Sequence, residues 1–400
     1  MAGTLVTPRT AGMSDSGYPT DLLSAVRIRQ VMDEVLKLSE VDTDLIEVFG
    51  GLAGFQFITQ KIEWFEKDRW SRRPTHGGLA AAGTTSITVT GLSHKYPVGT
   101  IFRMGTELVR VTAVPDANTL TLKRGYAGTT AAAQASTVEM IVAGATMNPN
   151  DSWVSSATST PSNSYNYRQV WHRKLSSDWD SEATKAYGMK TAGDLDDQTM
   201  DAVEQALVAI NQSIIMGERY AGGGADAPAM TGGALYYVTA ANGADVTDVA
   251  SGPLTLASIH DMAQDLVYAI GSQAVGKNAL LLTDLWGKRK FDSFGVPGTI
   301  RQETDTTLGT LVTRLRTSFG EFRILPSISM PKQKTLFFGR PEFVKLGHMA
   351  NAGPISGRLH SGDIVESGGP FFSRYVYASF GTVFMGIPTM GLIHTYSLSA

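Results

Sequence analysis

The 400-residue sequence contains no cysteine. This absence excludes disulfide bonds, zinc sites with thiolate ligands and cysteine nucleophiles, and it is compatible with folding in a reducing cytoplasm. No run approaches the roughly 18 consecutive apolar residues that a membrane span needs. The N-terminal stretch M-A-G-T-L-V-T-P-R-T-A-G also lacks the apolar core of a signal peptide. We therefore expect neither membrane insertion nor secretion by that route.

Charged residues are sparse and nearly balanced in sign. They make up 18% of the chain, with 34 Lys and Arg against 37 Asp and Glu, whereas soluble domains usually hold roughly 25%. A formal charge of -3 does not predict a basic surface that wraps duplex DNA. A hydrophobic content of 42% and a mean hydropathy of -0.04 indicate ordinary globular folding, in two or three compact units at this length.

Motifs for catalysis and for ligand binding are also missing. The seven histidines are scattered, without an H-E-x-x-H pair or a G-x-S-x-G elbow. The stretch Gly271 to Asn278, G-S-Q-A-V-G-K-N, matches part of a phosphate-binding loop, but a predicted helix precedes it and a predicted strand follows it. We interpret it as a turn. The sequence thus predicts no catalytic residue, no cofactor and no metal, and the protein is not expected to be an enzyme.

The stretch K-I-E-W-F-E-K-D-R-W-S-R-R, Lys61 to Arg73, mixes bulky aromatics with both signs of charge. Strand alternation places Ile62 and Trp64 on one face and Phe65 on the other, and neither face is cleanly apolar. This composition resembles the centre and rim of a protein interface. The interleaved carboxylates favour a protein partner over single-stranded nucleic acid.

A similar stretch, Tyr165 to Asp180, follows about a hundred residues later, and the two could pair as a long antiparallel ribbon. We expect this ribbon to lie across a neighbouring subunit, with aromatic side chains that are exposed in the monomer and with no core resting on them. The predicted inter-subunit contacts are Lys61, Trp64, Phe65, Arg69, Trp70, Arg72, Arg73, Tyr167, Trp171, Arg173 and Trp179.

The remaining pattern predicts a mixture of helices and strands. Residues 1 to 54 form an arm around one helix over 20 to 37, and five short strands over 83 to 142 suggest a small β-barrel or sandwich. A long helix is expected from Leu195 to about Arg219, with acidic residues in its first turn. Then follow a helix over 255 to 270, a buried strand over 279 to 283, a helix over 284 to 294 and strands near 322 to 325 and 336 to 339, and the last sixty residues are predicted to be β.

This order of elements resembles a tailed-bacteriophage major capsid protein of the Hong Kong 97 fold, over nearly the whole chain. The resemblance implies an α+β fold with an N-terminal arm, an extended β-ribbon loop, a peripheral domain with a long spine helix, and an axial domain. The corresponding residues are 1–54 for the arm, 55–82 and 143–180 for the extended loop, 181–252 and 341–400 for the peripheral domain, and 253–340 for the axial domain. Residues 83–142 would be an all-β insertion in the extended loop, which the plainest family members lack.

The resemblance also implies partners and a location. The chain would assemble with itself, as the hexamers and pentamers of an icosahedral shell that encloses a phage genome. A portal protein, a separate scaffolding protein and a cement or decoration protein would be further partners, and packaged DNA would be contacted only non-specifically. The shell would belong to the virion and be assembled in the host bacterial cytoplasm. Two alternatives stay open at this point: an encapsulin-type compartment shell, and a β-rich adhesion or glycan-binding protein.

Overall fold

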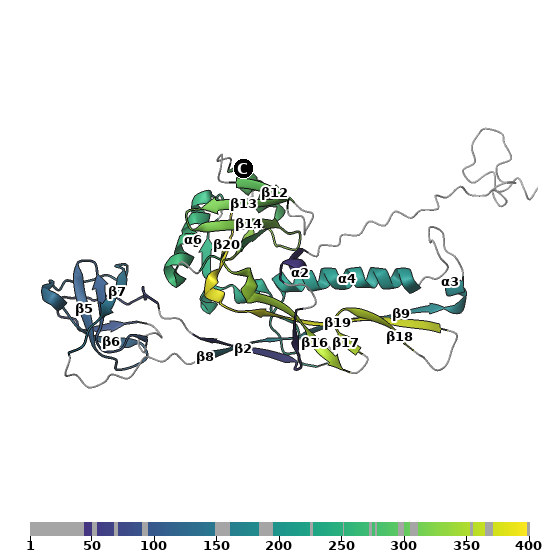
Figure 1. The fold of residues 1–400 in the computed structure, drawn as a ribbon, viewed down its shortest axis with the longest axis horizontal. Coiled ribbons are helices and arrows are strands. Elements are labelled where there is room, and N and C mark those ends of the chain that lie inside the picture. Colours follow the sequence, from purple (N-terminus) through teal and green to yellow (C-terminus); the bar gives the residue numbers. More distant parts are fainter. Residues whose placement is uncertain are drawn as a thin grey trace, which may run out of the picture.

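The computed structural model describes residues 44–49, 54–67, 71–89, 95–148, 161–183, 195–224, 227–250, 252–271, 274–276, 278–294, 300–304, 311–352, 355–364 and 371–397. The molecule is elongated, with a five-stranded sheet at one end and the helix α3 at the other (Figure 1). The predicted helix over 20–37 lies outside the described residues. None of the described helices is long and apolar enough to cross a membrane.

A six-stranded sheet and one long helix form the body of the molecule. The strands are β1 (Phe55–Phe57), β9 (Gln169–Asp178), β16 (Val344–Ala352), β17 (Ile355–Gly357), β18 (His360–Ile364) and β19 (Phe371–Phe384). The long strand β19 pairs with β9, β16 and β18, all antiparallel. Helix α4 (Leu195–Met216), about 33 Å long, packs on β19 and β9. Asp196 and Asp197 occupy its first turn, where the helix dipole favours negative charge.

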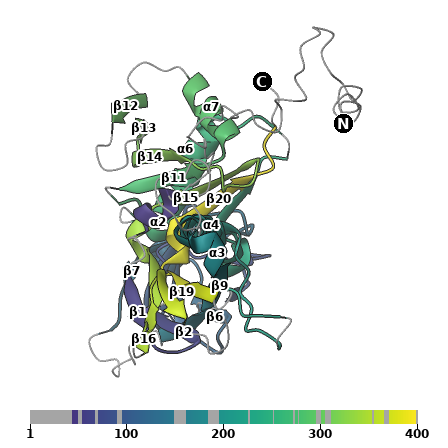
Figure 2. The ribbon, with the colours of Figure 1, turned by 90° about the vertical axis from the view of Figure 1, so that its right-hand side faces the viewer.

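A seven-stranded sheet lies on the other side of α4 (Figure 2). Its order is β10 (Asp245–Asp248), β20 (Met390–His394), β15 (Lys334–Phe338), β11 (Ala279–Thr283), β14 (Gly320–Pro326), β13 (Leu311–Thr317) and β12 (Ile300–Thr304). The side chains of Thr255 and Asp284 cap the helices α6 (Leu256–Ile270) and α7 (Leu285–Ser293). Strand β11, with the sequence A-L-L-L-T, is buried throughout, because core residues cover both of its faces.

The seven-stranded sheet combines strands from the segments predicted as the peripheral domain and as the axial domain. Strands β10 and β20 lie in residues predicted for the peripheral domain, and both belong to this sheet. Thr247 and Ile393 are register partners, as are Thr335 and Ile393, so β20 joins β10 to the central strands. This pairing is non-local, because the last described strand joins a sheet whose other strands precede it by more than fifty residues.

A separate five-stranded sheet is formed by β3 (Ser86–Thr88), β6 (Thr119–Lys123), β5 (Glu107–Ala113), β4 (Thr100–Met104) and β7 (Met140–Ala145), in that order. All five predicted strands are present, and their inward side chains form a core of their own. The compact region is wider than predicted. His76 Nε2 lies 2.6 Å from the carbonyl oxygen of Val138, and the Tyr96 hydroxyl donates to the Ser71 carbonyl over 2.7 Å.

Short elements complete the described part. They are the helices α2 (Asp44–Val48), α3 (Trp179–Ala183) and α5 (Ala234–Tyr237), the 3-10 turns η3 (Tyr126–Gly128), η4 (Ala240–Asn242), η5 (Pro341–Phe343) and η6 (Ile387–Thr389), and the ribbon strands β2 (Lys61–Lys67) and β8 (Pro161–Tyr167).

Candidate inter-subunit surface

Strands β2 and β8 pair as a two-stranded ribbon between the five-stranded sheet and the body of the molecule (Figure 1). Its register joins Lys61 to Tyr167 and Lys67 to Pro161. The ribbon is shorter than predicted, because residues 169–178 pair with β19 in the six-stranded sheet. Strand β1, also predicted in the extended loop, pairs with β16. The alternation of aromatic and charged residues is compatible with either partner, so the sequence alone did not separate β8 from β9.

One face of the ribbon is buried in the body. Ile62 and Trp64 are only 6% and 8% exposed, and both belong to the core that the two larger sheets share. The ring centroids of Trp64 and Tyr237 are 6.0 Å apart, and the Trp64 Nε1 donates to Glu66 Oε1 over 2.8 Å. A Cβ built on Gly381 would lie 2.4 Å from Ile62 Cδ1. The glycine therefore allows the ribbon to approach β19 closely.

The expectation that Trp64 is exposed in the monomer is therefore wrong. Its indole packs on side chains from α5 and β19, far away in the sequence, and these neighbours complete an apolar face that the strand alone does not show. A variant that loses Trp64 is expected to damage the fold itself.

Asn166 fixes the ribbon to the body, although it is not among the predicted contact residues. The residue is fully buried. Its side-chain nitrogen donates to the Thr382 and Gly232 carbonyls over 2.8 and 3.0 Å, and also contacts the Thr231 and Thr382 hydroxyls. Its oxygen accepts from the amides of Tyr167 and Gly232, both over 2.8 Å. Such a satisfied buried amide specifies one docking geometry. No sequence signal marks it, since its partners are distant in the chain.

The opposite face of the ribbon is exposed and mixes apolar and charged groups. Phe65 is 70% exposed. Lys61 forms an ion pair with Glu63 and lies 4.3 Å above the Tyr165 ring. That ion pair raises the pKa of Lys61 and lowers the pKa of Glu63, with the hydrogen bond between them as the largest cause in both. The surface therefore stays charged over a wide pH range.

The other predicted contact residues have different environments. Arg72 and Arg173 are exposed, whereas Tyr167 and Trp171 are half-buried, and Trp171 packs against the shared core. Arg73 is engaged within the subunit, in an ion pair with Glu139 over 2.5 Å and above the Tyr268 ring at 4.4 Å. Trp70 lies outside the described residues, as does Arg69, and Trp179 begins α3 without a described side chain.

No group of three or more His, Cys, Asp or Glu side chains among the described residues could hold a metal ion. The phosphate-loop-like segment that starts at Gly271 follows α6 and precedes β11, as the sequence predicted. A strand and not a helix N-terminus follows this segment, so the order of elements differs from that of a phosphate-binding loop.

Two solved capsid structures support the fold. The capsid of cyanophage A-1(L) is 10% identical over 94% of this chain and 99% of that chain, with a TM-score of 0.55. The capsid of a native GTA particle is 11% identical over 97% of this chain and 100% of that chain, with a TM-score of 0.50. The holo-SrpI encapsulin complex of Synechococcus elongatus PCC 7942 is 11% identical over 60% of this chain and 79% of that chain, with a TM-score of 0.44.

Among curated proteins there is no significant match. The family model described as SU10 major capsid protein matches residues 10–396, almost the whole chain. The two capsid structures show an α+β fold like that of Hong Kong 97. The family match favours a phage capsid over a compartment shell or an adhesion protein. The chain therefore belongs to the SU10 major capsid protein family: it is a structural protein of the virion that forms the shell of a phage head, and not an enzyme.

Proposed function

We propose that the chain assembles as the hexamers and pentamers of a closed icosahedral shell, and that the exposed face of the β2–β8 ribbon lies against a neighbouring subunit. The observation that supports this is Phe65, which is 70% exposed on a strand whose opposite face is buried. Phe65 lies among the charged residues of the same face, and an exposed aromatic inside a charged rim can anchor a neighbouring chain.

The composition of this face fits a protein partner. Phe65 supplies apolar area, while Lys61, Glu63 and Lys67 surround it with both signs of charge. An apolar anchor inside a charged rim is typical of protein interfaces, and the charges set orientation more than affinity. The proposed contact keeps six predicted residues whose side chains are described: Lys61, Phe65, Arg72, Tyr167, Trp171 and Arg173. Arg69, Trp70 and Trp179 are proposed from the sequence alone.

We also propose that residues 83–142 form an inserted domain of the extended loop. Its support is the independent core around Phe102, Val109 and Leu122 and the sheet that contains no strand from elsewhere. The resemblance alone supports the further partners: a portal protein, a separate scaffolding protein, a cement or decoration protein, and packaged DNA through non-specific contact. Assembly would take place in the host bacterial cytoplasm.

The substitution Phe65→Asp is expected to leave the subunit folded and to prevent shells. The side chain contributes little to the core of its own subunit, but a central interface aromatic can be worth on the order of 2 kcal/mol or more. The same loss recurs at every equivalent contact of a shell. Circular dichroism measures the fold, and sedimentation with electron microscopy measures the particles.

Phe65→Leu is the matched control, since it keeps an apolar side chain of similar reach and should still form shells. Wild-type particle yield from the Phe65→Asp variant would refute the proposed role of the ribbon.

A further inference from the structure

The residues of β4, β5 and β6 that point away from the core of the five-stranded sheet include three cations and no carboxylate. In β4, β5 and β6 every second residue points into the core, so the residues between them form the opposite face. Arg103 and Lys123 are exposed there, and Arg110 is half-buried. The half-buried apolar side chains between them are Ile101, Leu108 and Ile141. We call these six residues the cationic face.

The register places like charges next to one another. Arg110 and Lys123 are direct cross-strand partners, with Cβ atoms roughly 5 Å apart. Arg103 is a diagonal neighbour of Arg110, because Ile101 pairs with Arg110 and Arg103 pairs with Leu108. Like charges directly opposite each other destabilise a sheet.

No acidic residue of the described chain neutralises this repulsion. Arg103 Nε donates to the Gly105 carbonyl over 3.2 Å, and Arg110 donates from Nε and a terminal nitrogen to the Thr146 carbonyl over 3.3 and 3.2 Å. Lys123 and both arginines have no Asp or Glu contact within the described ranges. The repulsion between these cations is not relieved within the described part of the subunit. An acidic group from another chain would relieve it.

The net charge of the chain is also distributed unevenly, because the segment that contains the cationic face is basic and the rest of the chain is acidic. Residues 71–148 hold seven Lys and Arg against three Asp and Glu, a net charge of +4 in a chain of -3. The rest of the chain therefore holds 27 basic against 34 acidic residues, a net charge of -7. A subunit with one basic and one acidic part is attracted to a second copy in a head-to-tail arrangement.

The acidic counterpart lies where β9 ends and where α3 and α4 begin, at the opposite end of the molecule (Figure 1). We call it the acidic end, formed by Asp178, Asp180, Glu182, Asp196 and Asp197. Arg374 contacts Asp196 over 2.5 Å, yet the Asp196 side chain remains 83% exposed. Met200, one turn later on α4, is 66% exposed, so an apolar group stands beside the carboxylates. Carboxylates beside an exposed apolar side chain complement the cationic face, in which half-buried Ile and Leu side chains lie between the cations.

We propose that the cationic face of one subunit docks on the acidic end of a second copy. The two surfaces lie at opposite ends of the molecule and so cannot meet within one subunit. A heterologous contact of this kind generates rings when its rotation closes, and it rests on the proposed assembly into capsomers. The cationic face has no aromatic side chain on which bases could stack, so a protein partner is favoured over single-stranded nucleic acid.

A charge exchange tests this docking. In full-length chain, Arg103→Glu with Lys123→Glu reverses the cationic face, and Asp180→Lys with Asp197→Lys reverses the acidic end. All four positions are exposed, so circular dichroism should be unchanged. Each pair alone is expected to raise the concentration at which purified subunits form particles by about tenfold, measured by light scattering. The four substitutions in one chain are expected to restore the wild-type concentration.

A wild-type particle-forming concentration for the reversed cationic face would overturn the proposal. Failure of the fourfold variant to recover would also overturn it and would assign the face to an acidic protein other than this chain. If reversal abolished retention on duplex DNA without changing assembly, the partner would be a polyanion, which again contradicts the proposal. In each case the Phe65→Asp variant still tests the shell contact of the ribbon, so the two failures are distinguishable.

Discussion

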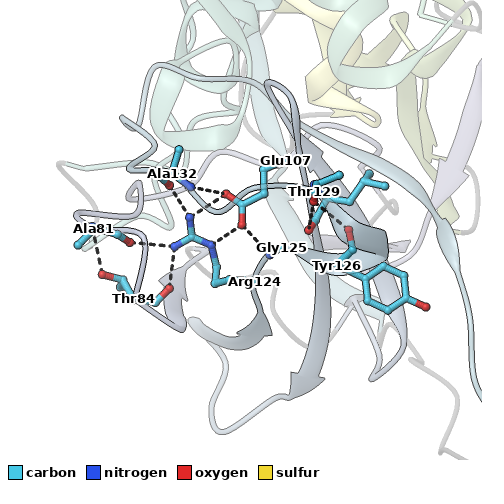
Figure 3. A network of polar contacts seen from close by, with 9 residues as sticks. Ala81, Thr84, Glu107, Arg124, Gly125, Tyr126, Thr129 and Ala132 are labelled. Carbon is cyan, nitrogen blue, oxygen red and sulfur yellow. Dashed lines mark hydrogen bonds and ion pairs between the residues drawn. The ribbon is translucent and has the colours of Figure 1, made fainter.

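Replacing Arg124 by methionine is expected to lower the free energy of unfolding of the five-stranded unit by about 3–5 kcal/mol. Arg124 and Glu107 form a two-pronged ion pair, with distances of 2.7 and 2.8 Å, and their side chains are 6% and 0% exposed (Figure 3). The guanidinium also donates to the carbonyls of Ala81, Thr84 and Ala132, which ties two loops to the sheet. Without Arg124, a buried carboxylate loses its countercharge.

Urea denaturation of unassembled subunits, followed by circular dichroism, measures this loss. Arg73→Met is the matched control, because the ion pair between Arg73 and Glu139 is largely exposed and should contribute at most about 1 kcal/mol. Equal midpoints for Arg124→Met and the wild type would show that the buried pair does not hold the unit together.

The same pair predicts a loss of stability in acid. Burial acts to raise the pKa of Glu107, but the Arg124 guanidinium and the amides of Gly125 and Ala132 outweigh it and lower the pKa to about 2. The carboxyl has a pKa near 4.3 in an unfolded chain. The folded state therefore binds fewer protons, so its advantage is complete above roughly pH 4.5 and disappears as the pH falls toward 2, by about 3 kcal/mol in all. Glu107→Gln should remove this part of the pH dependence.

Trp64→Ala is expected to destabilise the body of the subunit by about 3–5 kcal/mol, as large-to-small substitutions of buried tryptophan do. The indole fills the space between the ribbon, Tyr237 and β19, and its Nε1 holds Glu66, whose other oxygen accepts from the Gly386 amide over 3.2 Å. The cavity would also loosen the ribbon that presents Phe65.

Phe65→Ala, the next residue on the same strand, is the comparison, and it should change the urea midpoint little because its side chain is exposed. The pair thus separates a residue that holds the fold from one that is proposed to hold the shell. A Trp64→Ala variant as stable as Phe65→Ala would contradict the assignment of the two faces.

The elements with strong local signals could be predicted from the sequence. Strand β11 is a short apolar run followed by the capping residue Asp284, and its predicted bounds agree with the structure. The five strands of the separate sheet are divided by turn residues such as Gly105 and Gly125, both with positive φ. These features depend on residues close together in the chain, which a sequence pattern records directly.

The features that could not be predicted depend on distant partners. The burial of Trp64 requires Tyr237 and Phe384, and the docking of Asn166 requires Thr382, 216 residues away. The Glu107 and Arg124 pair does have a signal in the sequence, because Glu107 occupies an inward position of an alternating strand. A carboxylate at such a position needs a buried cation.

The proposed shell contact of the ribbon is tested most directly by a reconstruction of the assembled particle by electron cryomicroscopy, at a resolution that shows side chains. We expect a closed shell in which Phe65 of each subunit is covered by a neighbouring subunit, while Trp64 keeps its place against Tyr237 of its own subunit. A shell in which Phe65 faces solvent, with the ribbon touching no neighbour, would contradict this expectation.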